Sequence, residues 1–244
     1  MIGGNVWKEV LAVVWAPVRV LRDAAVHKRV LAAFIVTALY AALGLAGSAV
    51  IVLGGVTRAQ FEGQPAGLPP GTMENIREAT QVGVVVSSVL TPFVVWISVS
   101  LTMQFVTRFF GGGARVGTSE TNAVSDSDGS LAATLAAVGV SGVPLVISSA
   151  IGLVLSGLQV TLGAQSTAGI VLGYVAGLLG LAAFVWYVVL VVIGVAQARN
   201  LGYAESAGSC AVSCVGCAGL IILVVVVVGL GAALLIGPAI SPQG

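Results

Sequence analysis

The sequence has very little charge. Only 8% of its 244 residues are Asp, Glu, Lys or Arg, whereas 58% are hydrophobic. A soluble domain carries about a quarter charged residues, so this composition cannot cover a water-exposed surface. The mean hydropathy of +1.10 fits a chain that is largely surrounded by lipid. The composition therefore indicates an integral membrane protein.

Histidine is almost absent, which limits the chemistry available. His27 is the only one, and no Ser/His/Asp, Cys/His or HExxH arrangement can be drawn around it. The net charge is only +1, whereas a nucleic-acid-binding protein has a concentrated Lys/Arg surface. We therefore expect no catalysis, no cofactor and no nucleic-acid partner. Lysine is scarce as well, with two among ten basic residues, a bias that suggests a prokaryotic source.

The three cysteines, Cys210, Cys214 and Cys217, have the spacing of one helical face. Three thiols on a face could bind a soft metal, but no fourth ligand lies near them in the sequence. Small residues surround them, and small residues on a membrane helix usually permit close helix packing. The sequence predicts a packing role and no metal site.

Uninterrupted apolar runs occupy most of the chain. Each is near or above the roughly 20 residues that cross about 30 Å of hydrocarbon. None contains Asp, Glu, Lys or Arg, and none has the alternation of a barrel strand, so only helices can satisfy the backbone. The prediction is an all-α, polytopic protein whose 30–244 domain has five transmembrane helices, at about 30–56, 82–107, 131–157, 168–198 and 209–240.

The N-terminal segment 1–29 differs from these runs because it is amphipathic. Its apolar residues recur at spacings of four and three, which places them in one stripe on a helix: Trp7, Leu11, Val14, Val18 and Leu21. Pro17 is expected to kink or restart this helix. Trp on one side and Lys/Arg on the other predict a cytoplasmic helix lying in the membrane interface. The alternative is a helix packed on the end of the bundle.

The basic residues predict the orientation. Eight of the ten lie at the N-terminus or after the second and fourth runs, and only Arg58 and Arg77 lie on the other side. Basic residues mark the cytoplasmic side, so we expect the N-terminus inside and the C-terminus outside. If the source is a prokaryote, the membrane is the plasma membrane.

Two loops and two prolines complete the pattern. Thr72 is expected to cap a helix that continues into the second run. Gly111–Gly113 lacks the motif of a phosphate-binding loop and predicts a flexible connection.

Pro92 and Pro144 could break their helices around a binding site. Static kinks are favoured, because the runs hold no charged group of the kind that ion-coupled transporters use.

Three short motifs resemble the Yip-one domain family of five-span membrane proteins, named for interaction with Ypt/Rab GTPases. Trp7-Lys-Glu-Val-Leu with Ala16-Pro17 is similar to the N-terminal segment of prokaryotic members. Gly139-Val-Ser141-Gly-Val-Pro144 resembles the family's Gly-Tyr-Ser motif followed by Pro. The run from Trp186 to Gly194, followed by Arg199 to Ala204, resembles the fourth span and the start of the next helix. The resemblance implies a prokaryotic member without enzymatic activity.

The first functional hypothesis is membrane organisation, vesicle trafficking or scaffolding through lipid and protein contacts. The resemblance implies a small GTPase as a possible partner, and the Gly-rich run 169–180 would permit a homo-oligomer. Cytoplasmic basic residues are the candidate contacts for anionic lipid or a partner, or they merely set the topology: Arg19, Arg22, Lys28, Arg29, Arg108 and Arg115.

The second hypothesis is a transporter or channel subunit for a neutral or apolar solute. Kinked helices with small polar residues can line a pore even without buried charge. The candidate lining consists of Ser98, Ser100, Thr102, Gln104, Ser148 and Ser149. A continuous polar cavity bounded by Pro92 and Pro144 would favour this hypothesis.

Overall fold

The computed structural model describes residues 12–53, 72–109, 129–163 and 166–213. Within these ranges all regular structure is helical, as predicted. The helices are η1 (Ala12–Val14), α2 (Pro17–Val26), α3 (Val30–Leu53), α5 (Thr72–Phe109), α6 (Leu131–Val140), α7 (Val143–Leu162) and α8 (Thr167–Arg199). Residues 203–213 form a further helical segment.

Four helical stretches among the described residues are long and apolar enough to cross a membrane. They are Val30–Val50, Gln81–Arg108, Leu131–Leu162 and Thr167–Arg199. These correspond to the first four predicted spans. The fifth, at 209–240, lies outside the described residues beyond residue 213, so the total of five stays a prediction.

Local side chains explain several helix boundaries. The Ser130 hydroxyl accepts a hydrogen bond from the Ala133 backbone N–H at 3.3 Å and caps α6. Ser166 caps α8 in the same way, with 3.0 Å to the Gly169 N–H. Such caps satisfy N–H groups that have no partner within the helix. Asn200, with φ +55°, ends α8 in the left-handed conformation that commonly follows a helix.

The third predicted span is not one continuous helix, contrary to expectation. α6 ends at Val140, Ser141 and Gly142 form a turn, and α7 begins at Val143. Pro144 falls in the first turn of α7, where its missing N–H leaves no intrahelical bond unmade. The expected kink at Pro144 is therefore a break just before it. By contrast, α5 continues through Pro92.

The two helices on either side of the break, α6 and α7, have different structural roles. α7 has 20 residues, which at 1.5 Å per residue reach about 30 Å and can cross a bilayer alone. α6 instead packs among α2, α3, α5 and α8, with seven of its ten residues buried. α6 is the central element of one end of the bundle.

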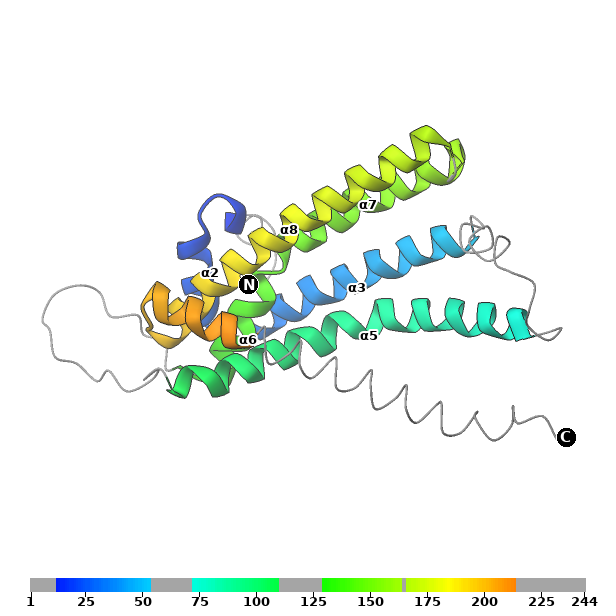
Figure 1. Cartoon of the computed structure of the whole chain (residues 1–244). Coiled ribbons are helices and arrows are strands. Elements are labelled where there is room, and N and C mark those ends of the chain that lie inside the picture. The colour runs from blue at the N-terminus through cyan, green and yellow to red at the C-terminus, as the bar shows by residue number, and fades with distance from the viewer. Residues whose placement is uncertain (1–11, 54–71, 110–128, 164–165, 214–244) are drawn as a thin grey trace, which may run out of the picture.

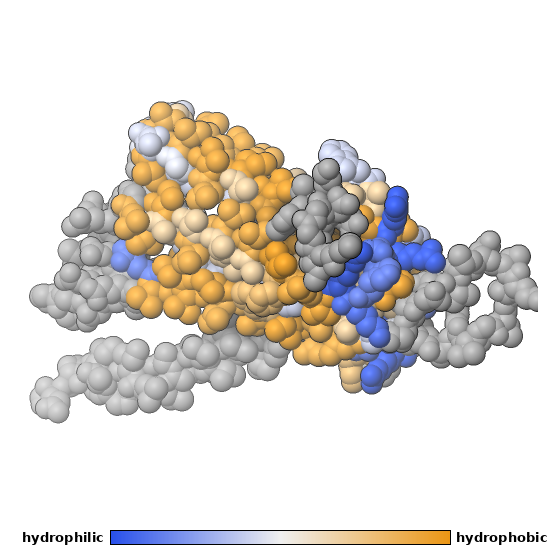
Figure 2. Space-filling model, turned by 180° about the vertical axis from the view of Figure 1, so that it is seen from behind, coloured by the Kyte–Doolittle hydropathy of each residue, from blue (hydrophilic) through white to orange (hydrophobic). Residues whose placement is uncertain are grey.

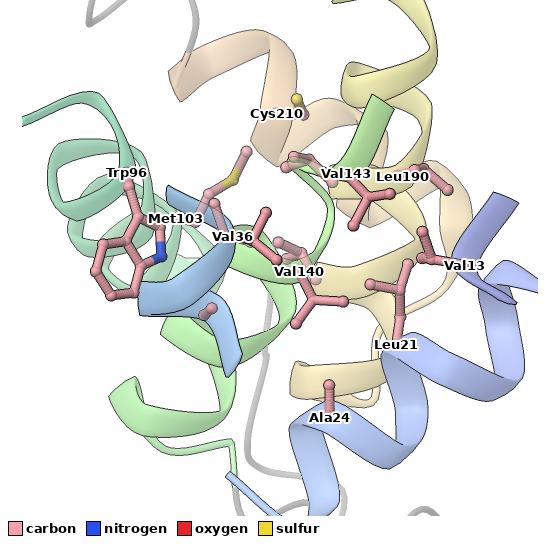
Figure 3. Close-up of a cluster of buried hydrophobic side chains, with 14 residues drawn as sticks. Val13, Leu21, Ala24, Val36, Trp96, Met103, Val140, Val143, Leu190 and Cys210 are labelled. Atoms are coloured by element: carbon pink, nitrogen blue, oxygen red, sulfur yellow. The ribbon is translucent and has the colours of Figure 1, made fainter. Parts of the chain in front are cut away.

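The bundle is compact at that end and open at the other. Figure 1 shows the α3–α5 pair and the α7–α8 pair converging where α2, α6 and residues 203–213 gather, and diverging toward the opposite end. The main buried apolar cluster lies at the compact end (Figure 3) and includes Val13, Leu21, Val36, Trp96, Met103, Val140, Val143, Leu190 and Cys210. The other halves of the helices present large apolar side chains outward, as lipid-facing helices do.

α2 docks on this cluster rather than continuing a single N-terminal helix. Its buried residues Leu21, Ala24 and Ala25 face α6 and α8. The predicted five-residue stripe is therefore wrong in part. The chain turns between η1 and α2, so Val18 is 43% exposed although Leu21 is fully buried. Pro17 restarts the helix, as predicted, at the first turn of α2, and Trp7 and Leu11 lie outside the described residues.

Candidate functional site

Figure 2 shows that the largest group of hydrophilic residues lies at the compact end of the molecule. α2 contributes Arg19, which is exposed, and Arg22, which is half-buried. The α2–α3 junction adds exposed Lys28 and half-buried Arg29, and the end of α5 adds exposed Arg108. The structure thus places five of the six predicted basic residues at one end, here called the basic end. Arg115 lies outside the described residues.

An acidic residue that the sequence analysis did not single out organises part of the basic end. One carboxylate oxygen of Asp23 lies 2.8 Å from the guanidinium of Arg29, and the other lies 3.0 Å from Nδ1 of His27. The side chains are 34% exposed for Arg29, 40% for Asp23 and 62% for His27, so water screens these pairs. The i, i+4 spacing of Asp23 and His27 was the available sequence signal. Arg29 is held by Asp23 at the start of α3.

Below this surface a buried polar cluster joins α5, α6 and α8. The Thr134 hydroxyl donates to the Gln104 side-chain carbonyl at 3.0 Å, and the Gln104 amide donates to the Gly129 carbonyl at 3.3 Å. The Arg199 guanidinium donates to that same carbonyl. Arg199, predicted as a charge that sets the topology and as part of a family-like motif, is 4% exposed. Gln104, predicted to line a pore, instead joins these helices.

The Gly-x-Ser motif forms a very close crossing, with the shortest added-Cβ distance among the described glycines. A Cβ added to Gly139 would lie 2.4 Å from the Cβ of Ala33 and 2.8 Å from the indole nitrogen of Trp96. That nitrogen donates to the Leu135 carbonyl at 2.9 Å, which holds α5 against α6. The buried Ser141 hydroxyl donates to the Ala137 carbonyl at 2.8 Å and would lie 3.4 Å from a Cβ on Gly194. Small residues therefore bring α3 and α8 against α6.

A cavity of about 500 Å³ lies beside this crossing. Residues of α3, α5, α6, α7 and α8 line it, and Gly142 contributes from the turn between α6 and α7. Among the described residues, its polar lining consists of the indole of Trp96, whose N–H already donates to the Leu135 carbonyl, and eight hydroxyl side chains, those of Thr37, Tyr40, Ser48, Ser87, Ser88, Thr91, Ser149 and Tyr187. No charged residue is among the described residues that line it. We call it the hydroxyl-lined cavity.

The residues predicted to line a pore mostly lie elsewhere. Among the six, only Ser149 lines the cavity. The hydroxyls of Ser100 and Thr102 donate to carbonyls of their own helix, those of Trp96 and Ser98. Pro92 lines the cavity, whereas Pro144 does not. The cavity is therefore not the continuous polar path between the two prolines that would favour the transport hypothesis.

Comparison with known families agrees with this architecture. The Yip1 domain matches residues 11–226, which include every described helix. The chain belongs to the Yip1 family. The family predicted from the three short motifs is thus confirmed, and with it the assignment to a membrane protein class. Comparisons with curated proteins and with solved structures give no match.

Within this Yip1 domain, the motif positions have structural roles. Gly139 and Ser141 shape the packing of α6, Pro144 begins α7, and Pro17 begins α2. Trp7 precedes the matched range. Sequence reasoning missed the partner Ala33, because this small residue has no motif of its own, and it named Gly194 as the end of a motif without its contact to α6.

The cysteine face is only partly described. Cys210 is buried in the main cluster, whereas Cys214 and Cys217 lie outside the described residues. Among the residues that the structure covers, no three His, Cys, Asp or Glu side chains gather as a metal site would require. The packing role predicted for these cysteines stays a prediction.

Proposed function

We propose that this Yip1 protein is a non-enzymatic membrane-organising protein that acts through its basic end. The observation that carries the proposal is the separation of charge. Five basic residues collect at the end built from α2, α3 and the C-terminal turn of α5, whereas the stretches 30–53, 81–107 and 131–198 hold no Asp, Glu, Lys or Arg. The basic residues at this end are thus available for recognition next to the membrane.

The proposed orientation places the basic end in the cytoplasm, because basic flanks stay on that side. There the anionic leaflet attracts each Lys or Arg near the surface by about 1 kcal/mol. Trp15, which precedes α2 and is 85% exposed, suits the headgroup level where Trp is enriched. The docked α2 would thus hold Trp15 and Arg19 at the membrane surface.

The partner that we propose is a small GTPase or another membrane protein with an acidic contact surface, which the family resemblance implies. Such contacts would serve vesicle formation or the organisation of membrane proteins. For a prokaryotic source the site of action would be the plasma membrane. Electrostatic complementarity at an exposed basic surface mainly raises association rate and specificity, so binding should weaken as the salt concentration rises.

Affinity capture in native lipid nanodiscs tests the proposal. The wild-type chain is compared with Arg19→Glu/Arg22→Glu and with Arg77→Glu, a single charge reversal near the opposite end of α5. We expect a small GTPase or coat component to co-purify with the wild type and with Arg77→Glu but not with the double variant. Recovery of an ATPase or a solute-binding protein would overturn the proposal in favour of transport.

A further inference from the structure

The hydroxyl-lined cavity lies apart from the basic end and has a distinct chemistry. We propose that it binds an uncharged, single-chain lipid with a hydroxyl head group, such as a monoacylglycerol or a long-chain alcohol. This inference goes beyond the proposed role of the basic end and does not depend on it.

The absence of charge in the lining sets the first requirement. Apart from the Trp96 indole, whose N–H already donates to the Leu135 carbonyl, the polar side chains of the described lining are Ser, Thr or Tyr. No acidic or basic residue occurs in 30–53, 81–107 or 131–198. A carboxylate or an ammonium held there would lose its hydration without gaining a counter-ion, which is strongly unfavourable. The ligand is therefore neutral.

The hydrogen-bonding state of the lining sets the second requirement. Three hydroxyls already donate to their own helices, from Thr37 to Ala33 at 3.0 Å, from Ser87 to Val84 at 3.0 Å, and from Ser88 to Val85 at 2.8 Å. Their oxygens retain lone pairs, so toward a ligand they act as acceptors. A ligand that satisfies them must carry a donor.

Pro92 adds a backbone acceptor to the same wall. Because proline has no N–H, the Ser88 carbonyl loses its usual donor four residues later. This carbonyl faces Gly44 of α3, where an added Cβ would lie 3.5 Å away. Both Ser88 and Gly44 line the cavity. The proline thus raises the number of acceptors without breaking the helix.

Other hydroxyls in the lining can both donate and accept. Tyr40, Ser48, Thr91 and Ser149 make no hydrogen bond with another described residue. They come from three helices, α3, α5 and α7, around one space. An alcohol group is itself one donor and two acceptors, so it matches this mixture better than a group that only accepts.

The remaining lining fits an apolar chain. Val36, Val95, Leu145 and Phe184 supply apolar walls, and about 500 Å³ is within the roughly 300–1,000 Å³ of small-molecule sites. Val95 is 42% exposed and Phe184 is 52% exposed. These two residues mark an edge between α5 and α8 through which a lipid chain can enter from the bilayer.

Photolabelling of the full-length protein in nanodiscs tests the proposal. The probe is a long-chain alcohol that carries a diazirine and an alkyne, and mass spectrometry maps the labelled peptides. We expect labels on the lining segments of α3, α5 and α7. Unlabelled alcohol of the same chain length should compete at least tenfold better than the matching fatty acid or alkylamine. Equal competition by all three would overturn the proposal.

Two variants with matched controls locate the site. Ser149→Phe should fill the cavity and lower labelling at least tenfold, whereas Val154→Phe, at a 63% exposed position of the same helix, should not. Tyr40→Phe removes one hydroxyl without changing shape and should weaken alcohol competition about three- to tenfold. Tyr174→Phe, at a 72% exposed position, should leave it unchanged.

The two variants keep the proposal falsifiable if one of them misfolds, because Tyr40→Phe changes no packing volume. Unchanged labelling in Ser149→Phe together with unchanged competition in Tyr40→Phe would overturn it. The Arg19→Glu/Arg22→Glu variant should be labelled like the wild type. Failure of the basic-end proposal is thereby distinguished from failure of the lipid site.

Discussion

Gly139 of α6 lies so close to Ala33 of α3 that a Cβ on Gly139 would be 2.4 Å from the Cβ of Ala33. Real Cβ atoms do not approach one another at that distance, so α3 and α6 can cross here only because one of the two residues lacks a side chain. The same crossing brings Trp96 of α5 within hydrogen-bonding distance of Leu135. The crossing therefore joins three helices, and it supports one wall of the hydroxyl-lined cavity.

Gly139→Ala should destabilise the fold, because the added methyl group has no room. Overpacking of this kind costs about 1–3 kcal/mol of the free energy of unfolding. Gly152→Ala is the matched control, since a Cβ there meets nothing within 4 Å and alanine favours the helix. Thermal and SDS-induced unfolding of the purified proteins in micelles would measure both. Equal stability of the two variants would contradict the close crossing.

Trp96→Phe should also lower stability, by about 1 kcal/mol, because it removes the indole donor to Leu135. Trp186→Phe provides the comparison. Its indole is 39% exposed on α8, so its loss should change the unfolding free energy by less than about 0.5 kcal/mol. The same unfolding measurements apply. A larger effect at Trp186 than at Trp96 would count against the role assigned to the Trp96–Leu135 bond.

Thr134→Val tests the buried polar cluster. The substitution keeps the shape of the side chain but removes the donor to Gln104, which leaves a partly buried carbonyl without that bond and should cost about 1 kcal/mol. Thr161→Val makes the same chemical change at an exposed position, where the Thr hydroxyl bonds only within its own helix. Only Thr134→Val should lower the midpoint of thermal unfolding clearly.

Orientation can be measured by cysteine accessibility in a variant whose three native cysteines are replaced by Ser or Ala. That replacement should itself leave the protein assembled, because we assign the native cysteines a packing role. Lys28→Cys at the basic end should react with a membrane-impermeant maleimide only from the cytoplasmic side. Thr161→Cys, near the other end of α7, should react only from outside. The reverse pattern would show that the predicted orientation is wrong.

The ends of the membrane helices could be predicted closely where an apolar run stops at a polar or charged residue. The fourth apolar run was expected at 168–198, and α8 covers Thr167–Arg199. The first was expected from residue 30, and α3 begins at Val30. In both cases the apolar run is bounded by polar or charged residues. Within the run the backbone has to be helical, because lipid offers no hydrogen-bond partners for its N–H and C=O groups.

The turn at Ser141 and Gly142 could not be predicted in this way. Proline occurs both at kinks within a helix and in the first turn of a new helix. The presence of Pro144 alone therefore does not tell a kinked helix from two separate helices. The outcome depends on α6, which is buried among four other helices. Likewise, the stripe through Val14, Val18 and Leu21 placed residues on both sides of Pro17 on one face, whereas the chain turns before α2.

The sparse and unevenly placed charge by itself determined that this is a helical membrane protein with a basic end, because each transmembrane run must exclude charge and satisfy its own backbone. Only the tertiary structure decided that α2 docks, that Arg199 is buried against Gly129, and that one cavity collects hydroxyls from several helices. Those features depend on contacts between residues far apart in the sequence. Composition and periodicity describe each helix separately, whereas the approach of one helix to another depends on which small side chains meet.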